Sequence, residues 1–162
     1  MIHIGKYLRN TKDKGLILKP TKNLDIEVHV DADFAGLWAQ EDPMDPICVK
    51  SRTGFVISIA GCPVVWSSKL QQDIATSTMM SEYTALSMAM REVIPLRNTF
   101  QAVLDAVGQP ECKSSFKVTV WEDNMGCLKL AKMKPGQYTP RSKFYAIKYH
   151  WFRQVLHDRV VL

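Results

Sequence analysis

The chain has 162 residues, of which 46% are hydrophobic and 23% are charged. These values are typical of one globular domain and argue against a wholly disordered chain. No apolar run approaches the roughly 18–20 residues that span a bilayer, and the first residues lack the apolar core and cleavage site of a signal peptide. We therefore expect an intracellular protein with no membrane partner.

The net charge of +5 is unevenly distributed along the chain. Residues 1–23 hold six basic residues and one acid, and residues 129–162 hold eight and one. Residues 24–128 instead hold seven basic residues and fourteen acids. Basic ends around an acidic centre are compatible with a polyanion held at the ends and metal ions held in the centre. They are also compatible with basic ends that are merely solvated, so the charge distribution alone does not distinguish a binding surface from a solvated one.

The four cysteines, Cys48, Cys62, Cys112 and Cys127, are widely spaced and form no C-x-x-C motif. The four histidines are scattered, and none stands at metal-ligand spacing from a cysteine. This pattern argues against a zinc site and predicts reduced, mostly buried thiols. The chain also lacks a Gly-rich phosphate loop, so we expect no small-molecule cofactor.

The first half of the chain predicts a basic N-terminal segment followed by strands, because apolar and polar residues alternate there and Gly and Pro separate the runs. The predicted elements are, in order, a short helix or the tail of a preceding domain over 1–14, an edge strand or linker contact over 15–18, a strand over 26–31, a loop over 37–51, and a hairpin of strands over 53–60 and 63–69 with its turn at Gly61-Cys62.

The second half predicts mainly helices. Cap-type residues over 75–78 precede a helix, one face of which carries Met79, Tyr83, Leu86, Met90 and Val93. We expect Pro95 to kink or split this helix, with a second piece reaching about 107–108. The remaining predicted elements are a strand over 116–121, a short helix over 125–132, a loop over 134–141, a last helix striped by Phe144, Ile147, Trp151 and Val155, and the start of a strand over 159–162.

Three strands, a helix, a further strand and further helices predict an α/β fold with a mixed sheet and helices packed on it. Three acids stand at the ends of these elements: Asp31 ends a strand, Glu82 lies early in the main helix, and Asp123 follows the strand 116–121. Converging carboxylates repel one another, and hard divalent cations such as Mg²⁺ or Mn²⁺ relieve the repulsion. Taken singly, each acid is weak evidence, because an Asp at a strand end is more often a turn residue or a cap and a Glu early in a helix is more often a favourable placement on the helix dipole.

Several motifs resemble a known family. They are Asp31–Gly36, Ser51–Val56, Val65–Gln71, Ser77–Leu86, Glu122–Asn124 with Ala131-Lys132, and Arg141–Lys143 leading to Ile147–His150. Together they closely resemble the ribonuclease H domain of copia-type LTR retrotransposon Pol polyproteins. The opening, Gly5–Asp13, is similar to the last helix of the preceding reverse transcriptase region. The resemblance covers nearly the whole chain, with the motifs in the family's order and spacing.

This resemblance implies two segments: the tail of the reverse transcriptase or connection region over 1–23 and an RNase H-like domain over 24–162. It implies cleavage of the RNA strand of an RNA–DNA hybrid with two Mg²⁺ (or Mn²⁺) ions, held by Asp31, Glu82 and Asp123. Asp33 would face the same side as Asp31 only if the strand continued past Asp31. The implied location is a retrotransposon particle in the cytoplasm, or the nucleus, with the reverse transcriptase region of the same polyprotein as a partner.

Other residues are expected to contact the hybrid. Ser77 and Asn124 lie beside the acids and could touch phosphate or the 2′-OH. In the last helix, Arg141, Lys143, Lys148 and His150 are interleaved with aromatic residues and could neutralise phosphates. The alternative is an amphipathic helix whose aromatic residues pack on the sheet and whose cations are solvated.

Two positions depart from the family's pattern. Ala146 stands where the family usually has an Asp, and the family's fourth acid lies in a final helix, whereas the chain ends at Leu162. We therefore expect a C-terminally truncated domain that lacks this helix and one metal ligand. The alternative to an active nuclease is a catalytically incomplete remnant that binds nucleic acid or packs against a polymerase without cutting. A purely structural domain is a third alternative.

Overall fold

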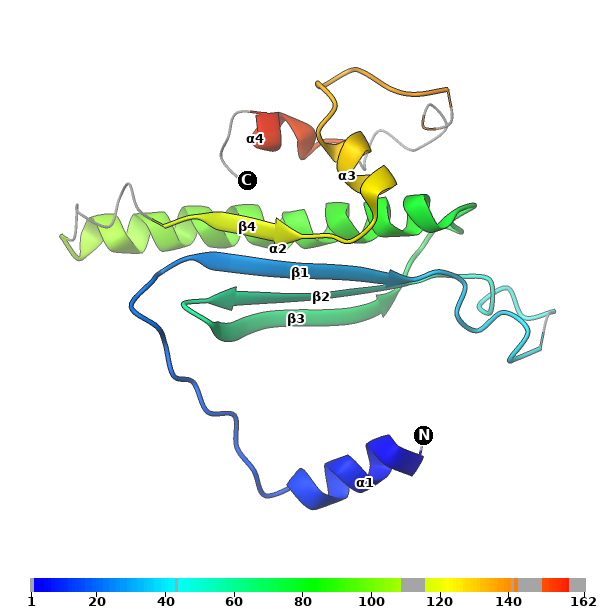
Figure 1. The fold of residues 1–162 in the computed structure, drawn as a ribbon, viewed down its shortest axis with the longest axis horizontal. Coiled ribbons are helices and arrows are strands. Elements are labelled where there is room, and N and C mark those ends of the chain that lie inside the picture. The colour runs from blue at the N-terminus through cyan, green and yellow to red at the C-terminus, as the bar shows by residue number, and fades with distance from the viewer. Residues whose placement is uncertain (1, 43, 109–115, 141, 143–149, 158–162) are drawn as a thin grey trace.

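A four-stranded sheet forms the centre of the computed structural model, which describes residues 2–42, 44–108, 116–140, 142 and 150–157. The strands are β1 (Ile26–Asp33), β2 (Arg52–Ile59), β3 (Cys62–Leu70) and β4 (Val118–Trp121), in the order β3-β2-β1-β4 (Figure 1). β1 pairs antiparallel with β2 and parallel with β4, and β2 pairs antiparallel with β3. The predicted mixed α/β architecture is thus confirmed, and it is consistent with an RNase H-like fold.

The hairpin between β2 and β3 turns one residue earlier than predicted. Ile59 pairs with Cys62, so the two turn residues are Ala60 and Gly61, both with positive φ, at 52° and 77°. A two-residue turn with positive φ at both positions has the twist that matches antiparallel strands. Gly61 adopts a positive φ freely, whereas the same left-handed conformation costs Ala60 roughly 1–2 kcal/mol because of its Cβ atom.

The helix α2 (Thr78–Ala106) crosses one face of the sheet. Its buried face includes Tyr83, Leu86, Met90 and Val93, as the periodicity predicts, and Met79 packs partly buried against the same core. On the sheet side, the alternate residues of β1 (Ile26, Val28, Val30 and Ala32) complete this core. Burial of about a dozen apolar side chains between these layers holds the helix on the sheet.

The helix does not split at Pro95, which stands inside α2. A proline in a helix interior loses one hydrogen bond and costs about 3 kcal/mol or more. Here the side chain is exposed, and apolar residues on both sides of it, including Val93, Leu96 and Phe100, belong to or pack against the same core. Because both halves bury their apolar residues against one core, a continuous helix is favoured over two separate pieces.

The N-terminal helix is separate from the sheet. The helix α1 (Ile2–Thr11) has no buried residue and lies away from the rest of the chain (Figure 1). Residues 15–18 form no strand, and Leu16, Ile17 and Leu18 are exposed. The alternative of an edge strand there is therefore wrong, because residues 15–18 pair with none of the four strands.

Two short helices, α3 (Met125–Ala131) and α4 (Arg153–His157), follow β4 on the same side as α2. Of the predicted last-helix stripe, Val155 packs against the core and Trp151 precedes α4, while Phe144 and Ile147 lie outside the described residues. The predicted start of a strand over 159–162 also lies outside them. Among the residues that the structure describes, no helix combines the length and apolar character needed to cross a membrane.

Candidate metal site

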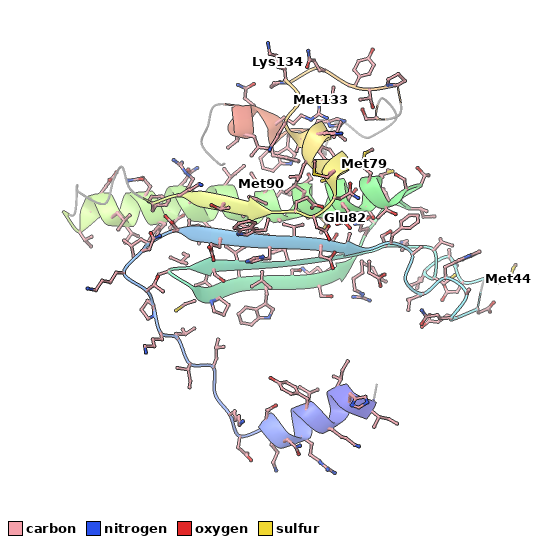
Figure 2. All side chains as sticks on the ribbon, in the orientation of Figure 1. Met44, Met79, Glu82, Met90, Met133 and Lys134 are labelled. Carbon is pink, nitrogen blue, oxygen red and sulfur yellow. The ribbon has the colours of Figure 1, made fainter. Side chains whose placement is uncertain are left out.

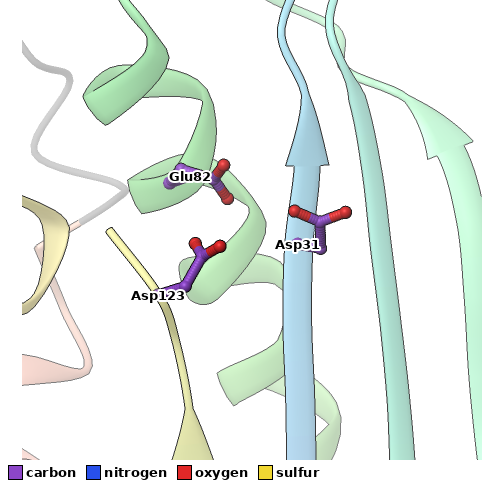
Figure 3. A group of neighbouring side chains, drawn as sticks. All are labelled: Asp31, Glu82 and Asp123. Carbon is purple, nitrogen blue, oxygen red and sulfur yellow. The ribbon is translucent and has the colours of Figure 1, made fainter. Parts of the chain in front are cut away.

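Three carboxylates from separate elements meet at one edge of the sheet. Asp31, Glu82 and Asp123 each offer one oxygen, and these atoms lie within 4.8 Å of one another. Figure 3 shows the three side chains pointing toward a common point from β1, from α2 and from the segment after β4. The convergence expected from the sequence is therefore present in the folded chain.

Asp31 owes its position to the alternation of β1. Its neighbours Val30 and Ala32 point into the core, so Asp31 points to the opposite, open face of the sheet. An open depression of about 270 Å³ borders this face beside the three acids. Its lining residues are His29, Val30, Asp31, Trp121, Glu122 and Asp123.

Glu82 is held in the second turn of α2. The Ser77 hydroxyl caps the helix by accepting a hydrogen bond from the Met80 backbone N–H at 3.2 Å. The buried Gln71 side chain donates to the Ser81 carbonyl at 2.8 Å and to the Thr53 hydroxyl at 3.1 Å, which fastens the start of α2 to β2. Figure 2 shows Glu82 where α2 passes the ends of β1 and β4.

Burial makes Glu82 an unusual carboxylate, since only 4% of its surface is exposed. Burial raises its pKa to about 7, and the charges of Glu122, Asp31 and Asp123 add to the rise, while a hydrogen bond from the Ala32 backbone N–H lowers it. Its Oε2 atom is buried and has no hydrogen-bond partner. A carboxyl group in such a place is neutralised by a proton or paired with a cation.

Asp123 follows β4, which runs parallel to β1, so the two strands end at the same edge of the sheet. The next residue, Asn124, caps α3 by accepting a hydrogen bond from the Cys127 backbone N–H at 3.0 Å. Asp123 is thus held between the last residue of β4 and the first turn of α3. The side chain is exposed and faces Asp31 across the depression.

Glu122 is a further acid beside the site that sequence reasoning did not single out. Burial raises its pKa to about 7, and the charges of Asp123 and Asp31 raise it further. A hydrogen bond from the Asn124 backbone N–H and the adjacent Cys127 thiol lower it. A signal was present in the sequence: strand alternation places Glu122 on the opposite face from the exposed Trp121, toward the core.

Asp33 shares the face of Asp31, because β1 continues to residue 33. Its carboxylate nevertheless does not belong to the group of three. It packs over Gly36, where a Cβ atom would overlap the Asp33 carboxylate. Asp33 is therefore directed toward the turn after β1 and not toward the other acids.

Of the residues expected to contact nucleic acid, the structure describes Ser77, Asn124 and His150. Ser77 and Asn124 both use a side-chain oxygen to cap helices, α2 and α3. His150 is half-buried, and its Nδ1 lies 2.9 Å from the Tyr83 hydroxyl, which also accepts a hydrogen bond from Arg153 Nε at 2.8 Å. Burial and the nearby Arg153 lower the pKa of His150. Arg141, Lys143 and Lys148 lie outside the described residues.

The described cysteines fit the expectation from the sequence. Cys48, Cys62 and Cys127 are buried and free of disulfides. Burial, together with the charge of Glu122, raises the pKa of the Cys127 thiol, which therefore stays protonated at neutral pH. It contributes no anionic ligand to the acids beside it.

The residues of this site fit a hard divalent cation. The donor set contains carboxylate oxygens only, which suits Mg²⁺ or Mn²⁺ better than zinc. The buried Oε2 of Glu82 lacks any hydrogen-bond donor, and a cation placed among the three acids would supply the missing positive partner. The open depression leaves Asp31 and Asp123 accessible from solvent.

No protein-family model matches the chain. It is 30% identical over 155 residues to the "Retrovirus-related Pol polyprotein from transposon TNT 1-94" of Nicotiana tabacum, covering 96% of this chain and 10% of the relative. It is 26% identical over 148 residues to the Pol polyprotein from transposon RE2 of Arabidopsis thaliana, covering 91% and 9%. It is also 32% identical over 89 residues to the "Secreted RxLR effector protein 161" of Plasmopara viticola, covering 55% and 57%.

The two transposon proteins match almost the whole of this chain, whereas the chain spans about a tenth of their length. The chain is thus a homologue of one region of the retrovirus-related Pol polyproteins of plant transposons.

Proposed function

We propose that this chain is the ribonuclease H domain of a copia-type retrotransposon Pol polyprotein and cleaves the RNA strand of RNA–DNA hybrids. The observation that carries the proposal is the meeting of Asp31, Glu82 and Asp123, with oxygens within 4.8 Å of one another, in a homologue of Pol polyproteins. Acidic groups alone are common on protein surfaces. The buried, unpaired oxygen of Glu82 is what makes this group a candidate for metal binding.

Each acid has its own part in the proposed site. Asp31 and Asp123 are exposed and would hold the metal on the side from which a phosphodiester approaches, and Glu82 would hold it from the protein interior. Two Mg²⁺ or Mn²⁺ ions bound there would activate a water molecule and stabilise the leaving oxygen of the cleaved phosphodiester. The open depression borders Asp31 and Asp123, so these two acids are on the side that a phosphodiester would approach.

The proposal includes partners and a cellular location. The substrate is an RNA–DNA hybrid, whose phosphates the basic residues would neutralise. The reverse transcriptase region of the same polyprotein would be the neighbour of residues 1–23, which place α1 away from the sheet. The activity belongs in a retrotransposon particle, in the cytoplasm or in the nucleus.

The experiment compares wild-type chain with two matched variants on a hybrid labelled in its RNA strand, with Mg²⁺ and with Mn²⁺. Asp31→Asn removes one proposed ligand, and Asp33→Asn makes the same change two residues along the same strand face. We expect cleavage by wild-type chain and by D33N, and a loss of at least about 100-fold in D31N, since the ligand acts directly on the reacting phosphate.

Equal activity of all three chains would exclude Asp31 as a ligand and contradict the proposed three-acid site. Binding of the hybrid without cleavage in any of them would favour the second candidate, a catalytically incomplete remnant. One sequence observation supports that candidate: Ala146 stands where the resembled family usually has an Asp. A chain that neither binds nor cuts the hybrid would contradict both.

A further inference from the structure

We propose that Glu122 is a positioning residue that holds Asp123 in place for the metal, an inference that rests on the metal site of the proposed function. Glu122 immediately precedes Asp123, and its side chain borders the depression and accepts a hydrogen bond from the backbone N–H of Asn124, the N-cap of α3. It is not one of the three acids whose oxygens converge. The proposed effect on Asp123 passes through the backbone that joins the two residues.

The backbone around Asp123 is held by two successive hydrogen bonds. Glu122 Oε1 accepts from the Asn124 backbone N–H at 3.0 Å, and Asn124 Oδ1 accepts from the Cys127 backbone N–H at 3.0 Å. The first bond spans Asp123, and the second attaches Asn124 to α3. Together they fix the direction in which Asp123 leaves β4, which sets the position of its carboxylate opposite Asp31 and Glu82.

On one side, Glu122 is surrounded mainly by apolar side chains, which cannot replace its carboxylate as a hydrogen-bond acceptor. Behind the site lies a cavity of about 360 Å³, and Glu122 lines it together with mostly apolar side chains. The other lining residues are Leu86, Met90, Val120, Leu128, Ala131, Lys132 and Leu156. If the carboxylate were lost, the half-buried Asn124 N–H would lose its acceptor, and we expect the turn to rearrange to find another.

Glu122 also lines the depression at the three acids, so one side chain borders both spaces. The Cys127 thiol of α3 lies beside the same carboxyl group. These contacts hold the Glu122 side chain from several sides. A group that is itself held by packing can fix a neighbouring ligand more tightly than a solvated loop could.

Two variants separate the hydrogen bond from other properties of the side chain. Glu122→Gln keeps a carbonyl oxygen that can accept from the Asn124 N–H, whereas Glu122→Met fills the same space without an acceptor. Glu27→Gln, an exposed acid on β1, is the control for losing one negative charge elsewhere in the sheet. The probe is Mn²⁺ alone, titrated by calorimetry and by the electron paramagnetic resonance signal of the free ion.

We expect E122Q and E27Q to bind Mn²⁺ within about twofold of wild-type chain, and E122M to bind about tenfold more weakly, as is typical for a lost outer partner of a metal ligand. Circular dichroism and thermal unfolding without metal would establish that each variant is folded. If hybrid cleavage also fell about tenfold in E122M and stayed near the wild-type level in E122Q, the result would extend to the proposed reaction.

Other outcomes would overturn the inference. Equal Mn²⁺ affinity of E122M and wild-type chain would exclude a positioning role while leaving the metal site intact. An equal loss in E122Q and E122M would assign the effect to the carboxylate charge and not to the hydrogen bond. A folded E122Q beside an unfolded E122M would make the bond a requirement of the fold alone. Absence of Mn²⁺ binding to wild-type chain would instead contradict the metal site itself.

Discussion

Glu122 is the charged neighbour that raises the pKa of Glu82 most, ahead of Asp31 and Asp123. Glu82 is buried and Glu122 is half-buried, and each has a buried Oε2 atom with no hydrogen-bond partner. Without a cation the four carboxylates of this region repel one another, and a bound proton relieves part of the repulsion. Metal binding and proton binding at this site therefore compete, which leads to two of the predictions below.

Magnesium should stabilise the chain more at pH 8 than at pH 6. The pKa values of Glu82 and Glu122 are raised to about 7, so at pH 6 protons occupy groups that a metal needs ionised. At ten times its dissociation constant, a bound ligand adds about 1.4 kcal/mol, which shifts the unfolding midpoint by about 3–6 °C. Thermal unfolding with Mg²⁺ and with an equal ionic strength of KCl at both pH values measures this difference. A shift that is equal at both pH values would contradict it.

Replacing Glu82 by Gln should stabilise the metal-free chain at pH 8 while weakening metal binding. The pKa of Glu82 is raised from its usual 4.5 to about 7, so the folded chain binds more protons than the unfolded chain between these values. Stability from this group is therefore complete below about pH 4.5 and is lost as the pH rises through about 7. Glu82→Gln removes this loss.

We expect the midpoint of unfolding of E82Q at pH 8 to exceed that of wild-type chain by about 2–4 °C, equivalent to roughly 1 kcal/mol. At pH 5 the two chains should unfold at nearly the same temperature, because Glu82 is then protonated. Glu92→Gln, at an exposed position of the same helix, is the matched control. A lower stability of E82Q at pH 8 would show that the amide is tolerated less well than the charge.

Replacing Tyr83 by Phe should destabilise the packing of α4 on α2. The Tyr83 hydroxyl accepts a hydrogen bond from Arg153 Nε at 2.8 Å, and only 2% of the Arg153 surface is exposed. Loss of a partner of a buried charged group costs about 2 kcal/mol, which lowers the unfolding midpoint by about 4–8 °C. Tyr7→Phe, at an exposed position of α1, should change it by less than about 1 °C. Equal midpoints of Y83F and wild-type chain would show that solvent replaces the lost hydroxyl.

Local patterns in the sequence predict much of this fold. Alternation in residues 26–31 and the spacing of Met79, Tyr83 and Leu86 identify the strand and the helix face, because one buried face imposes its period on the side chains. The same patterns place Asp31 at a strand end and Glu82 early in a helix. Their convergence with Asp123 then follows from the parallel pairing of β1 with β4, which the order of the elements anticipates.

The tertiary structure decided the points that depend on partners distant in the sequence. Proline disfavours a helix interior locally, yet α2 continues through Pro95 because its two halves bury their apolar residues against one core. Asp33 lies on the same strand face as Asp31, yet its contact with Gly36 directs it away from the other acids.

The same holds for the polar side chains around the site. Ser77 and Asn124 were expected at the substrate by their position in the motifs, and each one caps a helix. Glu122 stands in the same motif as Asp123, yet only the cavity between α2, β4, α3 and α4 and the Asn124 N–H determine what its carboxylate contacts. The sequence by itself thus determined which residues are acidic and on which elements they lie. Which of them meet was decided by packing, because burial and hydrogen-bond partners come from segments far apart in the chain.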